Sequence, residues 1–197
     1  MRAIVHDRYG IDALRLEKVE KPPLTDDGVL VRIHASSVNR EQCYKVSGVP
    51  WFLRLLSGLF RPRKPIVPGV DFAGTVEAVG KDVDHVRPGD EVFGGRTGAY
   101  AEYVCAREAE VLKPPSLSFE EAAAIPTAAI TALQGLRDRP GLQANQRVLI
   151  NGASGGVGIY AVQIAKALGA EVTAVCSTRN VSQAHELGAD HVLAATA

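Results

Sequence analysis

The sequence predicts a mixed architecture, in which a β-barrel or β-sandwich is followed by an α/β region with a parallel sheet. Before about residue 120, short strand-like segments alternate with Gly and Pro, a pattern typical of compact β structures. After residue 120, apolar strand-like runs alternate with helical segments, and this order indicates βαβ units. We therefore expect two domains, one over residues 1–120 and the other over residues 121–197.

Composition and charge exclude several classes of protein. Hydrophobic residues make up 46% and charged residues 22% of the 197 residues, as in ordinary globular proteins. The 22 basic side chains balance the 22 acidic ones, so no electrostatic footprint for nucleic acid is visible. No apolar stretch approaches the roughly 20 residues of a membrane-spanning helix, and the first residues lack the apolar run of a secretory signal. We expect a cytoplasmic protein that neither binds nucleic acid nor inserts into a membrane.

The first region is divided into short strand candidates by turn residues. Gly74 lies inside one candidate, where a bend or bulge is expected. Pro88 and Gly89 predict a turn that leads into another. The candidates in chain order, including that turn, are 3–5, 14–19, 29–35, 70–79, 86–93 and 98–104.

The second region changes to a helical period. Ser118 and Glu121 have the spacing of a capping box, in which each side chain binds the other residue's backbone amide. The Ala-rich helix that follows is expected to run to about Leu136 with an interruption or bend at Pro126. The remaining candidates are strands at 147–151, 171–176 and 191–193 and helices at 156–168 and 181–187.

A glycine-rich turn between the strand at 147–151 and the helix at 156–168 carries the strongest functional signal. It fits the G-x-G-x-x-G fingerprint of dinucleotide-binding folds, except that Ala153 replaces the first glycine. Gly155 lets the backbone approach a pyrophosphate, Gly158 lets the helix pack on the strand, and the helix N-terminus attracts the anion. The alternative is a βα turn without a ligand. The candidate cofactor-binding residues of the turn are Ala153, Ser154, Gly155, Gly156, Val157 and Gly158.

The residues after the strand at 171–176 bear on the choice of cofactor. In NAD-preferring proteins an acidic residue about 20 positions beyond the glycines holds the ribose. This chain has no acid between Glu171 and Glu186 and carries Ser177, Thr178 and Arg179 there. Hydroxyls and a guanidinium bind a 2′-phosphate by charge-assisted hydrogen bonds, although the same residues can also form a plain turn with a solvated arginine. We expect NADPH rather than NADH.

Besides the glycine turn, four further segments carry a family resemblance, at 68–80, 88–93, 98–103 and 122–133. Through them, from residue 1 to about residue 193, the chain resembles the zinc-free quinone oxidoreductase branch of the medium-chain dehydrogenase/reductases. The resemblance implies a GroES-like β-barrel catalytic domain joined to the first half of a Rossmann domain, with the nicotinamide in the cleft between them. It also implies hydride transfer from NADPH to a quinone or another small hydrophobic conjugated carbonyl.

Whether the chain binds zinc depends on the positions at which the zinc-dependent alcohol dehydrogenases carry their zinc ligands. Those enzymes carry a cysteine near residues 40–43 and Gly-His-Glu near 69–71, where this chain has Gly69-Val70-Asp71. Cys43 alone cannot complete the three protein ligands of a catalytic zinc. The other cysteines, Cys105 and Cys176, lie far away in the sequence, which gives neither a disulfide framework nor zinc spacing. We therefore expect no zinc. Without a metal as Lewis acid, the negative charge that develops on the acceptor is less stabilised, and conjugated acceptors are affected least because they spread this charge over several atoms.

The resemblance further implies which residues face the substrate. In the family, the segment aligned with 39–48 lines the substrate side of the cleft; Asn39 and Tyr44 match family positions there. Gln42 replaces the acid that is usual among quinone reductases. Thr127 matches a residue that contacts the nicotinamide. The candidate catalytic residues are therefore Asn39, Tyr44 and Thr127. The alternative for Tyr44 is a half-buried helix residue without a catalytic role, and the alternative for Thr127 is a small residue that only packs in its helix.

The apolar segment 51–60 is expected to be a helical flap over the substrate pocket, rather than a membrane-surface contact.

The region from Arg147 onward holds only half of a doubly wound dinucleotide fold, which has six strands. We expect a chain truncated relative to the family, with an open sheet edge through which it self-associates or is completed by another chain. Three interpretations remain open. The chain is an NADPH-dependent quinone or enone oxidoreductase, active or inactive in this truncated form. It is a non-catalytic nucleotide-binding or interaction module, or it is an enoyl reductase or zinc-free alcohol dehydrogenase.

Overall fold

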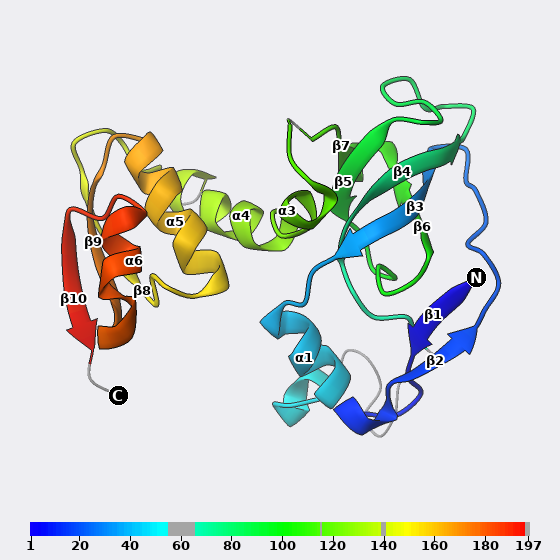
Figure 1. Cartoon of the computed structure of the whole chain (residues 1–197), viewed down its shortest axis with the longest axis horizontal. Helices are drawn as coiled ribbons and strands as arrows, with labels where there is room; N and C mark the ends of the chain where they lie inside the picture. Colours follow the sequence, from blue (N-terminus) through cyan, green and yellow to red (C-terminus); the bar gives the residue numbers. More distant parts are fainter. Residues whose placement is uncertain (55–65, 115, 139–140, 196–197) are drawn as a thin grey trace. The chain divides into compact units, whose positions relative to one another are not determined.

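The structure, a computed structural model, describes residues 1–54, 66–114, 116–138 and 141–195 (Figure 1). The chain divides into two compact units, Met1–Thr127 and Ala128–Ala197. Among the described residues, no helix combines the length and the apolar character needed to cross a bilayer. The expected flap over 51–60 falls largely outside the described residues; its first part forms the short 3₁₀ helix η2 (Trp51–Leu53).

The first unit is built on a five-stranded antiparallel sheet with the strand order β6-β3-β4-β5-β7. Apolar side chains of its central strands, among them Val31, Phe72 and Val92, are buried in one core. This half-barrel sheet confirms the β-rich, GroES-like first region. Its strands are β3 (Gly28–Ser36), β4 (Asp71–Val79), β5 (Glu91–Gly95), β6 (Tyr103–Arg107) and β7 (Val111–Leu112). A separate hairpin pairs β1 (Arg2–Val5) with β2 (Arg15–Lys18).

The strand expected at 98–104 is wrong over residues 98–102, because β6 begins only at Tyr103. Gly98 has φ +109°, a conformation that extended strands do not use. The backbone of 98–100 instead bonds to the preceding turn: the Gly98 amide donates to the Gly69 carbonyl at 3.0 Å, and the Tyr100 amide donates to the Pro68 carbonyl at 3.0 Å. Turn chemistry at one glycine therefore overrides the strand-forming residues beside it.

A β-bulge interrupts the pairing of β3 with β4. Ile33 is paired with Gly74 and Ala35 with Ala73, so that His34 is the extra residue. A Cβ atom at position 74 would lie 2.0 Å from the carbonyl oxygen of Arg32, which explains why the strand carries a glycine there. His34 lies outside the ladder: its Nε2 is 3.0 Å from the Thr75 hydroxyl. The bulge expected at Gly74 is confirmed.

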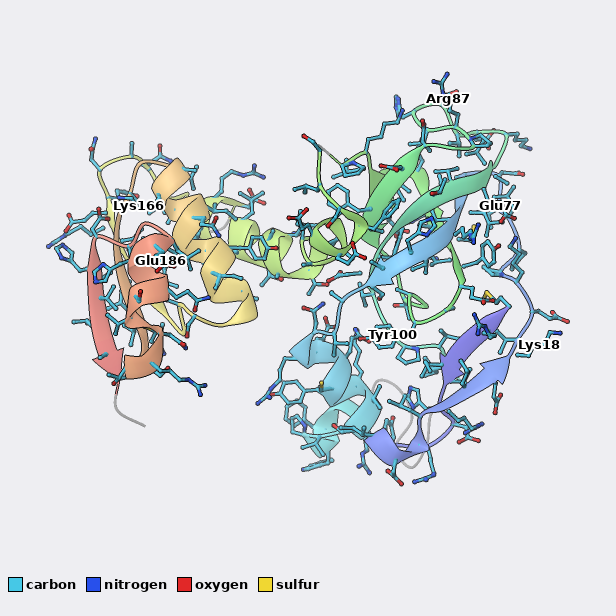
Figure 2. All side chains as sticks on the ribbon, in the orientation of Figure 1. Lys18, Glu77, Arg87, Tyr100, Lys166 and Glu186 are labelled. Atoms are coloured by element: carbon cyan, nitrogen blue, oxygen red, sulfur yellow. The ribbon has the colours of Figure 1, made fainter. Side chains whose placement is uncertain are left out.

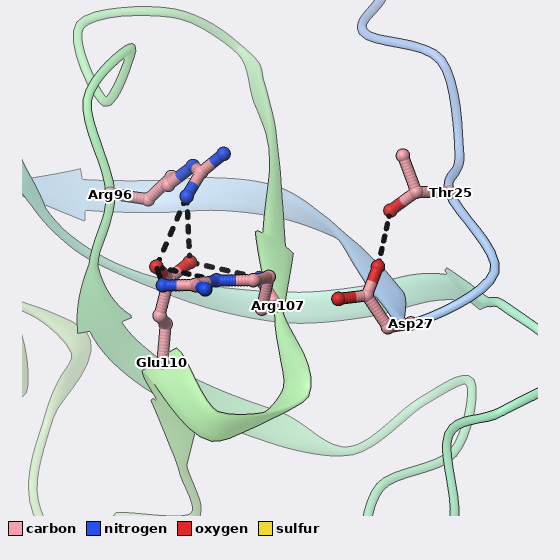
Figure 3. A network of polar contacts seen from close by, with 5 residues as sticks. All are labelled: Thr25, Asp27, Arg96, Arg107 and Glu110. Carbon is pink, nitrogen blue, oxygen red and sulfur yellow. Dashed lines mark hydrogen bonds and ion pairs between the residues drawn. The ribbon is translucent and has the colours of Figure 1, made fainter.

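A charged cluster lies where β6 turns toward β7 (Figure 3). Glu110, in the 3₁₀ turn η3 (Glu108–Glu110), accepts hydrogen bonds from Arg107 Nη2 at 2.7 Å and Arg96 Nη1 at 3.1 Å. Burial by itself would raise the pKa of Glu110, but the hydrogen bonds from Arg107 and the charges of both guanidinium groups lower it overall. The cluster thus links β5 to β6 through one carboxylate.

Short helices complete the first unit. Helix α3 begins with the expected capping box. The Glu121 amide donates to Ser118 Oγ, and the Glu121 carboxylate accepts from the Ser118 amide. The helix stops before Pro126, where α4 begins, as the interruption at this proline predicts. These helices are η1 (Ile11–Ala13), α1 (Arg40–Ser47), α3 (Phe119–Ala123) and α4 (Pro126–Leu133), whose first two residues belong to this unit.

The second unit contains a three-stranded parallel sheet with the order β10-β9-β8. Its helices α5 and α6 cover one face of the sheet (Figure 1). Buried alternate residues of β9, Val172, Ala174 and Cys176, pack beneath them. The elements are the π-helical turn η4 (Gln134–Asp138), β8 (Arg147–Asn151), α5 (Gly156–Ala167), β9 (Glu171–Ser177), η5 (Thr178–Asn180), α6 (Val181–Glu186) and β10 (His191–Ala195). The expected βαβ order and parallel pairing are confirmed.

Candidate functional site

Asp71, the first residue of β4, carries a fully buried carboxylate. Its Oδ1 accepts hydrogen bonds from the Thr127 backbone amide at 3.1 Å and the Thr127 hydroxyl at 2.6 Å. Its Oδ2 accepts from Ser37 Oγ at 2.9 Å and from Asn39 Nδ2 at 2.7 Å. A buried carboxylate is costly unless it is hydrogen-bonded, and these donors satisfy both oxygens. The carboxylate therefore ties the end of β3 and the start of α1 to the start of α4.

The start of α4 is favourable for this contact. Pro126 is its first residue and Thr127 its second. A helix leaves its first backbone amides without partners inside the helix, and proline at the first position removes one of them. Asp71, on a strand 56 residues earlier in the chain, accepts a hydrogen bond from the Thr127 amide. A negative group at a helix N-terminus is also stabilised by the helix dipole. Asp71 is thus a long-range cap for α4.

The structure brings two of the three candidate catalytic residues together. Asn39 and Thr127 meet at Asp71, whereas Tyr44 lies on α1 with 40% of its surface exposed. The Tyr44 hydroxyl accepts a hydrogen bond from Arg40 Nε at 3.2 Å, and this bond raises the pKa of the Arg40 guanidinium. Asp71 was not among the site residues expected from the sequence. Its signal was a carboxyl residue inside an otherwise apolar strand, which requires buried hydrogen-bond donors.

Gln42 has a structural role at the position where quinone reductases carry an acid. The side chain is buried on α1, and its Oε1 accepts a hydrogen bond from the Gly69 amide at 3.2 Å. A Cβ at Gly69 would lie 2.4 Å from the Tyr100 ring. Tyr100 (labelled in Figure 2) donates its hydroxyl to the Ser37 carbonyl at 3.1 Å, and burial raises the pKa of its phenol. Gln42 therefore holds the turn that packs Tyr100 beside the Asp71 network.

The glycine turn occupies the link between β8 and α5. Gly152 has φ +75°, and a Cβ at Gly158 would lie 2.2 Å from the Gly152 carbonyl oxygen. Gly155 and Gly156 are exposed, and a Cβ at Gly156 would have no atom within 4 Å. Gly155 precedes the 12-residue helix and provides no side-chain cap. The start of α5 is thus exposed and has no side-chain cap, and its first amides have no partners inside the helix, as an anion site at a helix N-terminus requires.

The other candidate cofactor residues follow β9, next to the glycine turn. Ser177 ends β9, and Thr178 and Arg179 are exposed in η5. Asn180 Nδ2 donates a hydrogen bond to Ser154 Oγ at 2.9 Å, which joins η5 directly to the turn. Sequence analysis did not assign Asn180. Its position immediately before a helix resembled an ordinary cap, although its side chain makes no cap hydrogen bond.

The rest of the turn lies against β9. The backbone amides of Gly152 and Ala153 both donate to the Val175 carbonyl at 3.0 Å, and Ala153 is fully buried. Val157 is 41% exposed. Residues 153–158 and 177–179 therefore gather at the carboxyl ends of β8 and β9, the edge where nucleotides bind in parallel α/β sheets.

The described residues fit a dinucleotide and do not offer a zinc site. Gly158 leaves no room for a side chain, and the exposed glycines beside it leave a backbone cradle for a pyrophosphate. Within the described ranges, no three His, Cys, Asp or Glu side chains come together in an arrangement that could hold a metal ion. Asp71 stands where the zinc enzymes carry the acid of Gly-His-Glu, and both of its oxygens already accept hydrogen bonds.

Comparison with known proteins places these features in a family. Residues 25–116 match the model of the alcohol dehydrogenase GroES-like domain, and residues 156–197 match the zinc-binding dehydrogenase model. Quinone-oxidoreductase QR1 of Triphysaria versicolor, a chloroplastic protein, is 39% identical over 98% of this chain and 60% of its own length. The chain thus spans about 60% of the length of this curated relative.

Two solved structures resemble the chain over its whole length. The CurK enoyl reductase has a TM-score of 0.91 and 27% identity, and the chain covers 60% of it. A mycobacterial structure complexed with NADPH has a TM-score of 0.86 and 29% identity, and the chain covers 59% of it. Both domain models and these relatives agree with a GroES-like domain followed by a Rossmann-like parallel sheet. The chain belongs to the medium-chain dehydrogenase/reductase superfamily, as a quinone-oxidoreductase-like member of an oxidoreductase lineage.

Proposed function

We propose that the protein is an NADPH-dependent oxidoreductase that transfers a hydride to a quinone or another conjugated carbonyl compound. The observation that carries the proposal is the open glycine turn at the start of α5, with exposed backbone at Gly155 and Gly156. The turn would hold the pyrophosphate, since backbone amides at a helix N-terminus bind anions. The cofactor would supply the hydride, and the chain would supply binding and orientation.

Preference for NADPH is supported by the residues beside that turn. Ser177, Thr178 and Arg179 follow β9 without an acidic neighbour up to Glu186, so no carboxylate there opposes a 2′-phosphate. Arg179 is exposed and can form charge-assisted hydrogen bonds with phosphate oxygens. A relative solved with NADPH supports the same choice.

Zinc independence is part of the proposal. It is supported by the hydrogen bonds that engage both Asp71 oxygens and by the lack of a converging ligand set among the described residues. Without a metal to stabilise a developing oxyanion, the acceptor must spread the charge itself, as quinones and enones do. The residues proposed to line the reacting side are Asn39, Tyr44 and Thr127, of which Asn39 and Thr127 are already fixed by Asp71.

The test is oxidation of NADPH by the purified protein with a panel of benzoquinones and naphthoquinones, together with a fluorescence titration of NADPH. We expect saturable binding and turnover, both unchanged after dialysis against a chelator. Turnover that disappears on chelation and returns with zinc would contradict the zinc-independent mechanism. Saturable binding without turnover of any acceptor would instead identify a nucleotide-binding module.

A second acceptor class has a specific observation in its favour. The CurK enoyl reductase matches the whole chain with a TM-score of 0.91, so α,β-unsaturated thioesters belong in the same assay panel. Faster turnover of an enoyl thioester than of any quinone would move the proposal to enoyl reduction. In either case we infer that the partner is a small hydrophobic conjugated molecule. The cytoplasmic location and association through the open sheet edge stay predictions.

A further inference from the structure

The side-chain amide nitrogen of Asn39 faces two acceptors inside the protein. Nδ2 lies 2.7 Å from Asp71 Oδ2 and 3.0 Å from Ser37 Oγ. These two acceptors are 2.9 Å apart, so both lie on the same side of the nitrogen. An amide nitrogen donates and cannot accept, and the nitrogen end of Asn39 is therefore turned toward Asp71 and Ser37.

The opposite orientation of this amide is chemically excluded while Asp71 is a carboxylate. The nitrogen and oxygen of an asparagine are distinguished by their hydrogen-bond partners. Exchanging them would place Asn39 Oδ1 at 2.7 Å from a carboxylate oxygen, two acceptors with no hydrogen between them. Since Asp71 is fully buried, no water can relieve that repulsion. Asp71 therefore determines which end of the Asn39 amide is presented outward.

The end presented outward is an acceptor. Asn39 is half-buried, and although it precedes α1 its side chain makes no cap hydrogen bond. Its carbonyl Oδ1 is thus the polar atom left for a ligand, and a carbonyl oxygen can only accept. A hydroxyl or amino group of a ligand matches this atom, whereas the carbonyl oxygen of a quinone does not.

We propose that Asp71 is a positioning residue that fixes Asn39 as a hydrogen-bond acceptor, so that Asn39 binds a donor group of the ligand. The identity of the ligand rests on the proposed function: the donor is a hydroxyl or amide group of NADPH, or a hydroxyl of the hydroquinone product. The outward carbonyl oxygen of Asn39 cannot donate, so it does not stabilise negative charge on the acceptor oxygen during hydride transfer. This role is opposite to that of an oxyanion-hole amide, which donates.

Two isosteric variants test the role of Asp71 without a ligand. In Asp71→Asn, the new amide nitrogen faces Asn39, and the Asn39 amide is expected to turn over so that its oxygen accepts and its NH₂ points outward. In the exchange variant Asp71→Asn/Asn39→Asp, the amide at 71 donates to the carboxylate at 39, and an acceptor again points outward. Asp84→Asn is the control, because it removes the same charge from an exposed position.

The first readout is hydrogen exchange of the Asn39 side-chain amide, measured by NMR and assigned by its loss in the exchange variant. We expect Asp71→Asn to accelerate exchange with water about tenfold or more, as the loss of a hydrogen bond to a charged group implies, and Asp84→Asn to leave it unchanged. Unaltered exchange in Asp71→Asn overturns the positioning role. This readout does not depend on cofactor or turnover, so it separates this proposal from the proposed function.

The second readout is ligand affinity, with NADPH and a naphthohydroquinone titrated separately under anaerobic conditions. We expect Asp71→Asn to weaken one of the two about tenfold, because two facing donors replace a donor–acceptor pair, and the exchange variant to restore most of the loss. The ligand that weakens identifies the source of the donor group. Unchanged or tighter binding of both ligands in Asp71→Asn overturns the assignment.

If Asp71→Asn fails to fold, the exchange variant decides. An exchange variant that folds and binds with near wild-type affinity supports the proposal, and one that folds but has lost its affinity contradicts it.

Discussion

The two candidate sites of this protein are built from different parts of the chain. At Asp71, four hydrogen bonds converge on one buried side chain, and three of them come from side chains. At the glycine turn, the site consists of backbone, and its most informative residues have no side chain. The first site therefore depends on which functional groups are present, whereas the second depends on which atoms are missing.

This difference predicts how each site responds to substitution. A side-chain network loses its partners when one group is removed, since each buried donor left without an acceptor costs free energy. A backbone site tolerates change at open positions and fails only where an added Cβ meets fixed atoms. The following substitutions sharpen or break this contrast.

Removal of the Asp71 carboxylate should have the largest effect. Asp71→Ala removes the acceptor of four hydrogen bonds, among them those from the Thr127 amide and the Asn39 side chain, and we expect a loss of about 3–5 kcal/mol in the free energy of unfolding of the first unit. Denaturant unfolding measures the loss. Asp84→Ala, at an exposed position, should cost less than about 0.5 kcal/mol. Similar costs at both positions would show that the network contributes little.

A methyl group at Gly158 should have the next largest effect. Its Cβ would lie 2.2 Å from the Gly152 carbonyl oxygen and 2.8 Å from backbone atoms of Ala153, none of which is the end of a flexible side chain. We expect Gly158→Ala to destabilise the second unit by about 1–3 kcal/mol and to abolish saturable NADPH binding.

The matched control for this substitution is Gly135→Ala. A Cβ at Gly135 would have no atom within 4 Å, and the residue lies in the π-helical turn η4. Thermal unfolding of both variants makes the comparison. We expect unchanged or slightly higher stability for Gly135→Ala, because alanine restricts the unfolded chain. Normal NADPH binding by Gly158→Ala would contradict the backbone account of the turn.

Loss of the Arg179 guanidinium should affect affinity and not stability. The side chain is exposed and follows β9 beside the glycine turn. We expect Arg179→Ala to weaken NADPH binding about tenfold while leaving NADH binding unchanged, because only NADPH carries the 2′-phosphate. Arg137→Ala, an exposed arginine of the same unit, is the control. Equal weakening for both nucleotides would remove the basis for NADPH preference.

The smallest expected effect is a change in acid stability. The folded protein holds the pKa of Glu110 below its ordinary value through Arg107 and Arg96, against the opposing effect of burial. A lowered carboxyl pKa contributes stability above the unfolded pKa, and this contribution is lost as pH falls through the folded pKa. We expect wild type to lose stability below about pH 4.5 more steeply than Glu110→Gln. Parallel pH profiles for the two proteins would show that the cluster in Figure 3 does not stabilise the fold.

Sequence patterns predicted the elements from Ser118 onward closely, because their signals are local. The capping box at Ser118, the break at Pro126 and the strand–turn–helix order around Gly155 each depend on residues a few positions apart. Alternation and turn residues also located most strands of the first unit. The exception at 98–102 arises because backbone hydrogen bonds to Pro68 and Gly69 hold that stretch as a turn.

The Asp71 network could not be predicted in the same way. Its members lie on β4, on α4 and in the link between β3 and α1, and the bond from Thr127 spans 56 residues. Periodicity and capping rules do not report contacts over such separations, and only the presence of a carboxyl group in an apolar strand indicated that partners were needed. Asn180 was missed for a related reason, because its bond to Ser154 joins two loops of the sheet edge.

The extra residue at His34 has a consequence for how this sequence can change over evolutionary time. Directly opposite residues of antiparallel strands share a face, and the extra residue stands between the pairs Ile33–Gly74 and Ala35–Ala73. Loss of His34 would therefore make the ladder regular and leave Ser36, whose hydroxyl donates to the Asp71 carbonyl at 2.6 Å, on its present face. An insertion or deletion at a regularly paired position of β3 would instead slip the register by one residue and move the following side chains to the other face. The bulge is therefore a position where β3 can change its length without exchanging its faces.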